Sequence, residues 1–180
     1  MNAENDAGGA PPAETHEVLN QPEPLEPFHA WRSDLALREA VVREGGGWAG
    51  PTLEAYGAAA GGPLFAAGFL AERNPPQFHS HDRYGRRSNL VEYHPAYHEL
   101  MRAAIEAGLP SLPWTEARAG AHVARAALEY MHNQADSGSG CPLTMTFAAI
   151  PALRLQPDVG EDWIRRATAR VYDGSNRPWH

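Results

Sequence analysis

The chain has 180 residues, enough for one domain with a substantial apolar core. Its formal net charge is −7, and residues 1–27 hold six of its 22 acidic residues and none of its 15 basic ones. The remainder is therefore nearly neutral, which excludes the broad basic surface of a nucleic-acid-binding domain. A single cysteine excludes an internal disulfide and a cysteine-based zinc site.

The sequence shows no targeting or membrane segment. Its first residues lack the basic and apolar regions of a signal peptide. The uncharged run at 55–71 contains four glycines and a proline, so we do not expect it to span a membrane. We therefore expect a cytoplasmic protein.

The N-terminal region divides into a tail and an arm. Residues 1–14 are acidic and rich in Ala, Gly and Pro, which predicts disorder. Residues 15–32 combine three prolines with large apolar residues that a solvated linker would not contain. We expect an extended arm that docks on its own domain or on a neighbouring subunit. Its candidate contact residues are Val18, Leu19, Leu25 and Phe28.

Residues 33–170 show the periodicity of an all-α domain, interrupted by a short irregular hairpin around 77–93. The first helix is expected to use Ser33 as its N-cap, and the longest to use Thr115. The predicted helices cover 34–44, 51–60, 63–73, 94–107, 116–135, 142–151 and 160–169. Residues 171–180 are expected to form a loop that leads out of the domain.

Two groups of polar residues are candidate sites. Arg83, Arg86 and Arg87 surround Tyr84 in the expected turn of the hairpin, where solvated loop charges are favoured over a nucleic-acid contact. His94 and His98 have the i,i+4 spacing of metal ligands, but their helix stripe continues with charged residues. No metal site is predicted.

The uncharged stretch 137–153, SGSGCPLTMTFAAIPAL, is the strongest candidate for a ligand-binding element. It opens with a flexible Ser-Gly-Ser-Gly run, after which Cys141 and Pro142 can start a helix that Pro151 kinks or ends. Because this helix is apolar nearly all round, we expect it to be buried. Its two threonines could face a pocket, although the spacing favours a core helix whose hydroxyls bond to the preceding turn.

Several runs of this sequence resemble a known family. They are THEVLNQPEPLE at 15–26, SDLALREAVVREGGGW at 33–48, VEYHPAYHELM at 91–101, the run 120–153 that contains CPLTMTFAA, and RVYDGSNRPW at 170–179. Together they resemble the N-terminal half of the AidB-type acyl-CoA dehydrogenase homologues, the adaptive-response flavoproteins. The resemblance implies an acyl-CoA-dehydrogenase-like N-terminal helical domain, here at 33–170.

The resemblance also implies a cofactor and partners. Members of the family are FAD-dependent homotetramers that oxidise acyl-CoA weakly, take part in the DNA alkylation response and bind duplex DNA through a C-terminal region. Their flavin-binding loop is expected just beyond Trp179, and the catalytic and DNA-binding parts further on. We therefore expect no catalytic residue in this chain, no tightly bound FAD and no strong DNA binding by it alone.

By the resemblance, the face of the central helix that carries Thr144, Met145 and Ala148 passes beside the acyl and flavin cavity of the longer protein. Leu143, Phe147 and Ile150 are expected to point into the helical core instead. The alternative is a stand-alone helical interaction module without catalytic activity, in which this helix is ordinary core.

Overall fold

The computed structural model describes residues 19–178, which form eight α-helices and one antiparallel hairpin. The all-α prediction with a short hairpin is confirmed, whereas the predicted tail at 1–14 and Val18 lie outside the described residues. The elements are α1 (Leu35–Arg43), a 3-10 turn (Gly47–Ala49), α2 (Gly50–Ala60), α3 (Pro63–Arg73), β1 (Gln77–His81), β2 (Arg87–Glu92), α4 (Pro95–Glu106), α5 (Leu112–Thr115), α6 (Ala121–Ala135), α7 (Ser137–Arg154) and α8 (Pro157–Ala167).

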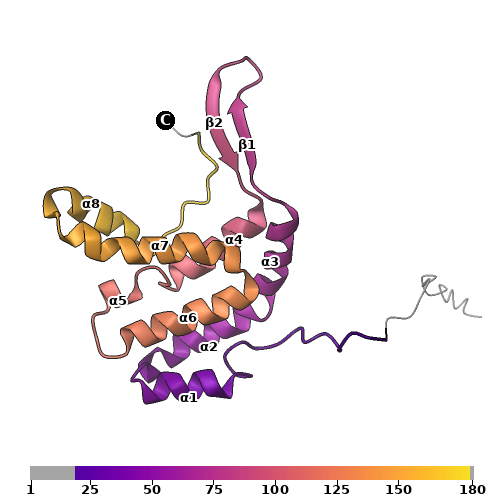
Figure 1. Ribbon diagram of the computed structural model, residues 1–180, viewed down its shortest axis with the longest axis vertical. Coiled ribbons are helices and arrows are strands. Elements are labelled where there is room, and N and C mark those ends of the chain that lie inside the picture. The colour runs from indigo at the N-terminus through magenta and orange to yellow at the C-terminus, as the bar shows by residue number, and fades with distance from the viewer. Residues whose placement is uncertain (1–18, 179–180) are drawn as a thin grey trace, which may run out of the picture.

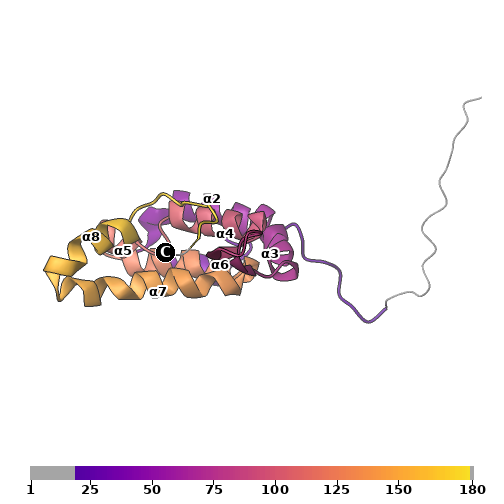
Figure 2. The same cartoon turned by 90° about the horizontal axis from the view of Figure 1, so that it is seen from above.

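Helix α6 is central to the packing. It contacts α1, α2, α3, α5 and α7, and its buried side is rich in alanine, which lets neighbouring helices approach closely. Helix α7 lies along α6, and α8 folds back beside α7 (Figure 1). Seen from above, α7 forms one long edge of a flat domain, with α2 and α4 on the other side (Figure 2). The apolar core between these layers includes Leu53, Leu100, Leu128 and Met131.

The hairpin projects away from the helices (Figure 1). Phe78 pairs with Val91 near its base, and the register shifts between His79 and His81. Its turn is held by Asp82, whose Oδ1 accepts hydrogen bonds from the backbone N–H groups of residues 84 (2.8 Å) and 86 (2.9 Å). This turn chemistry is typical of aspartate.

Neither Ser33 nor Thr115 is the N-cap that was predicted. Asp34, not Ser33, caps α1, with its Oδ1 2.8 Å from the N–H of residue 37. Helix α6 begins at Ala121, because Gly120 has a positive φ of 76° that breaks any helix continuing from Thr115. A Cβ at Gly120 would also lie 2.2 Å from the carbonyl oxygen of Gly45. Thr115 instead ends the short helix α5, which the sequence did not predict.

Helix α7 is longer than predicted at both ends. Asp136 caps it, so the Ser-Gly-Ser-Gly run that was expected to be flexible forms its first turn, and Pro142 lies inside the helix. The expectation that the helix is buried all round is also wrong. Only four of its residues are buried, and all of them lie on the side that faces α4 and α6: Ser139, Gly140, Leu143 and Ile150.

Pro151 does not end α7, because another residue replaces the hydrogen bond that proline cannot donate. In a regular helix, the N–H of residue 151 would bond to the carbonyl oxygen of Phe147. The indole Nε1 of Trp114 donates to that oxygen instead, at 3.1 Å. The Trp114 ring also stacks on the Phe147 ring, with centroids 4.9 Å apart. The short helix α5 thus supports α7 at its weakest backbone position.

The arm joins the body at Phe28. Its N–H donates to the carbonyl oxygen of Gly61 at 3.2 Å, and its ring meets Phe65 edge-on at 5.4 Å. A Cβ at Gly61 would lie 2.1 Å from the Phe28 oxygen, so this contact requires glycine. Residues 19–27 run away from the helices (Figure 1), and Leu19 and Leu25 are largely exposed.

None of the helices within residues 19–178 combines the length and hydropathy needed to cross a bilayer. Over the same residues, no three His, Cys, Asp or Glu side chains gather in a way that could hold a metal ion. The two histidines with i,i+4 spacing have other partners: Nδ1 of His94 accepts from the N–H of residue 96 at 3.1 Å and so caps α4, and Nδ1 of His98 bonds to the Tyr172 hydroxyl.

The role of Trp114 can be tested with a double-mutant cycle. Trp114→Phe should lower the free energy of unfolding by about 1 kcal/mol or more, because it leaves the Phe147 carbonyl without a donor. In a Pro151→Ala background, the new N–H of residue 151 supplies that bond, so the same change should cost less. Urea unfolding of the four proteins measures the coupling, and the loss of ring volume cancels in the cycle. Equal costs in both backgrounds would contradict this interpretation.

Candidate functional site

The outer face of α7 is the most unusual surface of the domain. Exposed helix faces of soluble proteins are normally charged or polar. Here the exposed stripe carries no charge and consists almost wholly of apolar side chains, following the helical spacing i, i+1, i+4, i+7, i+8 and i+11. Its members are Cys141, Pro142, Met145, Ala148, Ala149 and Ala152. An uncharged face of this length is typical of a surface that another element or a ligand covers.

Two of the three predicted cavity residues lie in this stripe. Met145 is 68% exposed and Ala148 is also exposed, so both project outward from α7. Thr144 lies at the edge of the stripe and is half-buried. Leu143 and Ile150 point into the core, as predicted, with 1% and 0% exposure. No ligand contact of Thr144, Met145 or Ala148 follows from these positions, so their role in a cavity stays a prediction.

A polar cluster behind the stripe fixes Thr144. Its hydroxyl donates to the carboxylate of Glu129 and accepts from Nη2 of Arg125 at 3.0 Å. Arg125 is 8% exposed, and it also donates to Glu129 at 2.5 Å and to the Leu109 carbonyl oxygen at 3.2 Å. Burial lowers the pKa of Arg125, and the Glu129 carboxylate opposes that shift. The Thr144 hydroxyl therefore has no proton left to donate to a ligand, and only its second lone pair can accept a further hydrogen bond.

Aromatic rings cover the same part of α7. The Arg125 guanidinium lies 4.1 Å from the centre of the Phe147 ring, and His122 meets that ring edge-on at 5.8 Å. Phe147 is only half-buried, since its outer part remains accessible beside Trp114. Cation–π contact and stacking hold these side chains in one arrangement. The wall beneath the stripe is therefore rigid.

A buried hydrogen-bonded chain fixes the start of α7. Tyr56 lies 2.8 Å from Nδ1 of His132, whose Nε2 lies 2.8 Å from the Ser139 hydroxyl. That hydroxyl donates to Asp136 at 2.5 Å, so it accepts from Nε2–H of His132. Burial lowers the pKa of His132 below the ordinary value, while the Asp136 and Glu129 carboxylates oppose the shift. In the neutral ring that burial favours, Nδ1 carries no proton and accepts from the Tyr56 hydroxyl.

This chain of side chains resembles a nucleophilic triad only in its residue types. Ser139 is 1% exposed and its proton is directed at Asp136 rather than at His132. A nucleophilic serine needs access to substrate and a base that accepts its proton. These hydrogen-bonded side chains therefore serve to join α2, α6 and α7.

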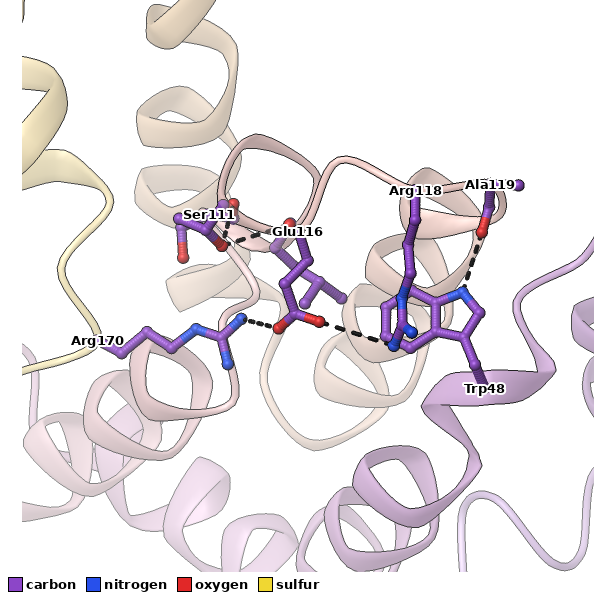
Figure 3. Close-up of polar contacts among 8 residues, drawn as sticks. Trp48, Ser111, Glu116, Arg118, Ala119 and Arg170 are labelled. Carbon is purple, nitrogen blue, oxygen red and sulfur yellow. Dashed lines mark hydrogen bonds and ion pairs between the residues drawn. The ribbon is translucent and has the colours of Figure 1, made fainter.

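The segment after α8 is anchored beside α5 (Figure 3). Glu116 lies between two arginines, 2.8 Å from Arg170 and 3.7 Å from Arg118. The guanidinium of Arg118 lies 3.3 Å from the centre of the Trp48 ring, and the Trp48 indole donates to the Ala119 carbonyl oxygen at 3.0 Å. A single carboxylate thus ties the C-terminal segment to the loop that precedes α6.

Further along, this segment is clamped to α4 and to Tyr93, which follows directly after β2. The Tyr172 hydroxyl lies 2.7 Å from Nδ1 of His98. The Asn176 side chain pairs with the backbone of Tyr93, accepting from its N–H at 3.1 Å and donating to its carbonyl oxygen at 3.4 Å. Burial raises the pKa of Tyr172, and the Arg102 guanidinium opposes that shift. Residues 170–178 are thereby directed from α8 towards the hairpin.

Sequence reasoning missed the residues that support the stripe. The helical spacing of α6 places Arg125, Glu129 and His132 outside its alanine-rich stripe, which would suggest a solvated face, but Arg125 and His132 are buried against α7 and α2. The i,i+4 spacing of Arg125 and Glu129 was a usable signal for an ion pair. Pro151 was a second signal, because a proline inside a helix leaves the carbonyl oxygen four residues earlier without its helical donor.

Comparisons with known proteins identify the family of this domain. The family model described as the adaptive response protein AidB N-terminal domain matches residues 20–174. The putative acyl-CoA dehydrogenase AidB of Escherichia coli (strain K12) is 44% identical over 168 residues, which is 92% of this chain and 31% of that protein. The chain thus spans about a third of its curated relative.

Two solved structures share the fold. Bd2924 in its apo form matches with a TM-score of 0.70 and 26% identity, over 79% of this chain and 30% of that one. ACDH-11 of Caenorhabditis elegans, in complex with C11-CoA, matches with a TM-score of 0.74 and 16% identity, over 88% of this chain and 29% of that one.

The helical fold with its projecting hairpin thus defines the N-terminal domain of an acyl-CoA dehydrogenase-like protein. Within that class, the chain belongs to the AidB N-terminal domain family. The recognition made from its sequence motifs is confirmed.

Acidification should test the His132 chain. The folded pKa of His132 lies below its unfolded value of about 6.5, so the unfolded state binds the proton first as the pH falls. The contribution of His132 to the free energy of unfolding is therefore fully present above about pH 6.5. Below that pH it decreases, by at most about 1.4 kcal/mol per pH unit. Urea unfolding at pH 7.5, 6.5 and 5.5 should show a steeper loss for the wild type than for His132→Gln.

The exposed His81 provides the control for this measurement. His81→Gln should retain the slope of the wild type. Equal slopes for the wild type and His132→Gln would show that His132 does not resist protonation in the folded protein.

Proposed function

We propose that this chain is the N-terminal helical domain of a longer, cytoplasmic, FAD-dependent acyl-CoA dehydrogenase-like protein of the DNA alkylation response. In that protein, the outer face of α7 forms one wall of the acyl and flavin cavity. The observation that carries the proposal is the uncharged exposed stripe on α7. The ligand class comes from the name of the E. coli relative, and the structure of ACDH-11 contains C11-CoA.

The stripe suits a thin apolar chain. Ala148 leaves space beside the helix, and Met145 is unbranched and can adjust its shape to an acyl chain. The ion pair of Arg125 and Glu129 lies behind Thr144 rather than in the stripe, so its charges do not oppose burial of an apolar ligand.

The bonding of Thr144 defines what it can contact. Because its proton is donated to Glu129, Thr144 would accept from an N–H or O–H group of the flavin or the coenzyme. A thioester carbonyl oxygen has no proton to donate, so it is not the partner of Thr144 in this arrangement. Thr144 is therefore a positioning contact rather than a catalytic residue.

The described residues fit FAD as one wall only. They offer an apolar face and the lone pair of Thr144 but no cluster of backbone N–H groups or basic side chains beside the stripe for the phosphates. A bound flavin would supply the oxidising equivalent for a CH–CH bond. The residues of this chain would bind and orient the acyl group and exclude water, and FAD would not bind tightly to this chain alone.

The arm supports a second part of the proposal, contacts between subunits of a homotetramer. Leu19 is 81% exposed and Leu25 75%, which leaves two large apolar side chains unpacked on an extended segment. Phe28 packs on the body and fixes where the arm leaves it. Val18 belongs to the same proposal but lies outside the described residues.

The alternative is a stand-alone helical interaction module without catalytic activity. The same stripe would then bind a partner protein. An in-frame continuation that encodes the flavin loop would favour the first proposal over this one.

The cavity role is tested in the longer protein that carries this domain. Ala148→Trp should weaken acyl-CoA binding at least about tenfold, because the indole fills the space proposed for the chain, which corresponds to about 1.4 kcal/mol. Flavin content and melting temperature should remain near those of the wild type, since Ala148 is exposed in this domain. Calorimetric titration with acyl-CoA measures the affinity.

Ala36→Trp on the exposed side of α1 is the matched control, and it should change none of these quantities. A large fall in melting temperature for Ala148→Trp, with binding lost only through unfolding, would mean that this face is packed core.

The arm is tested by deleting residues 15–27 while retaining Phe28. Helical content from circular dichroism should remain almost unchanged, because residues 19–27 lie outside the helical core. Association, measured by sedimentation velocity, should weaken. If the deletion unfolds the monomer instead, the arm is an intramolecular strap and the assembly role is wrong.

A further inference from the structure

A groove of about 720 Å³ opens at the base of the hairpin, between the end of α3, the start of α4 and the turn from α6 to α7. Its volume is typical of a binding site. The aromatic part of its wall consists of Phe65, Phe69, Tyr93 and Tyr97. Tyr93 and Tyr97 stack with centroids 4.3 Å apart, and burial raises the pKa of Tyr97 to about 12.

The charge of this groove is negative. Glu72 and Asp136 line it, and no arginine does within residues 19–178. Glu72 is exposed and has no ion-pair partner among the described residues. An occupant with aromatic and cationic groups would satisfy both properties of the groove.

The tip of the hairpin has the complementary chemistry. Tyr84 is 68% exposed, and the guanidinium groups of Arg83 and Arg86 lie 4.8 and 5.8 Å from the centre of its ring. Arg87 follows and donates to Asn89 at 3.0 Å. Over residues 19–178, none of these three arginines forms an ion pair. The tip is thus a cationic, aromatic knob on a projecting element.

We propose that the hairpin tip of one copy of this chain inserts into the groove of a second copy, and that the exchange is reciprocal. The Tyr84 ring would lie among the aromatic rings of the groove, and the arginines beside it would face Glu72 and Asp136. The contact joins charges of opposite sign that have no ion-pair partner within residues 19–178, which gives specificity as well as attraction.

The position of the groove makes a closed pair possible. Tyr93 and His94 line the groove and follow directly after β2, so the groove lies at the base of the same hairpin whose tip carries Tyr84. Two hairpins laid antiparallel about a two-fold axis would each place their tip at the base of the other. Such an isologous contact closes at two copies. It would also cover Phe78, which is 65% exposed on β1.

Charge selects the hairpin over the N-terminal arm as the occupant. The arm carries Glu23 and Glu26, and residues 1–27 contain no arginine or lysine. Its acidic residues would face the acidic groove, which opposes docking. The hairpin contact therefore goes beyond the proposed function and does not depend on the arm.

A charge-swap experiment with the 180-residue chain tests the contact. Arg86→Glu and Glu72→Arg each place like charges at both ends of the interface, so each variant alone should self-associate at least about tenfold more weakly than the wild type. An equimolar mixture of the two restores opposite charges at both ends and should recover association. Sedimentation velocity over a concentration series measures all four samples, and circular dichroism verifies that these exposed substitutions leave the helices intact.

Arg38→Glu on α1 is the matched control, and it should associate like the wild type. High salt should weaken association of the wild type. A wild-type chain that stays monomeric throughout the series, or a mixture that stays as weak as its components, would overturn the proposal. So would a dimer that is lost on deleting residues 15–27 but insensitive to Arg86→Glu, because the arm would then be the contact.

Discussion

The position of α7 on α6 is set by polar side chains, and the rest of the domain depends on that seam. Asp136 and Ser139 fix where α7 begins through His132, and Arg125 holds its middle through Thr144. Apolar packing alone would allow α7 to slide or rotate on the alanine-rich side of α6, since it is nondirectional. Directional hydrogen bonds specify one rotation of α7, and that rotation turns its uncharged stripe outward.

The limits of the secondary structure could largely be predicted. Pro63, Pro95 and the Asp82 turn marked their elements because local chemistry determines them. The prediction at Pro151 failed because a distant residue overrides the local rule. Pro151 remains helical because Trp114, 37 positions away, donates the missing bond, a contact that no pattern within α7 could reveal.

The candidate site was only partly predictable. The face that carries Met145 and Ala148 follows from helical spacing, and its exposure follows from the tertiary fold. The side chains that stabilise it do not follow from spacing. Arg125 and His132 look like solvent residues on α6, and they are buried because a neighbouring helix supplies partners for them. A polar residue is normally buried only where it has hydrogen-bond partners, and those partners are brought to it by the tertiary fold.

The clamp on the C-terminal segment has a consequence for the order of folding. His98 and Tyr172 are 74 positions apart, and Tyr93 and Asn176 are 83 apart, so closing these contacts requires a long loop to be ordered first. The helices between them form through contacts that are nearer in sequence. We therefore expect the segment 170–178 to settle last, on a body that is already built. During synthesis on the ribosome, the helical body can be complete before residues 170–178 are clamped to it.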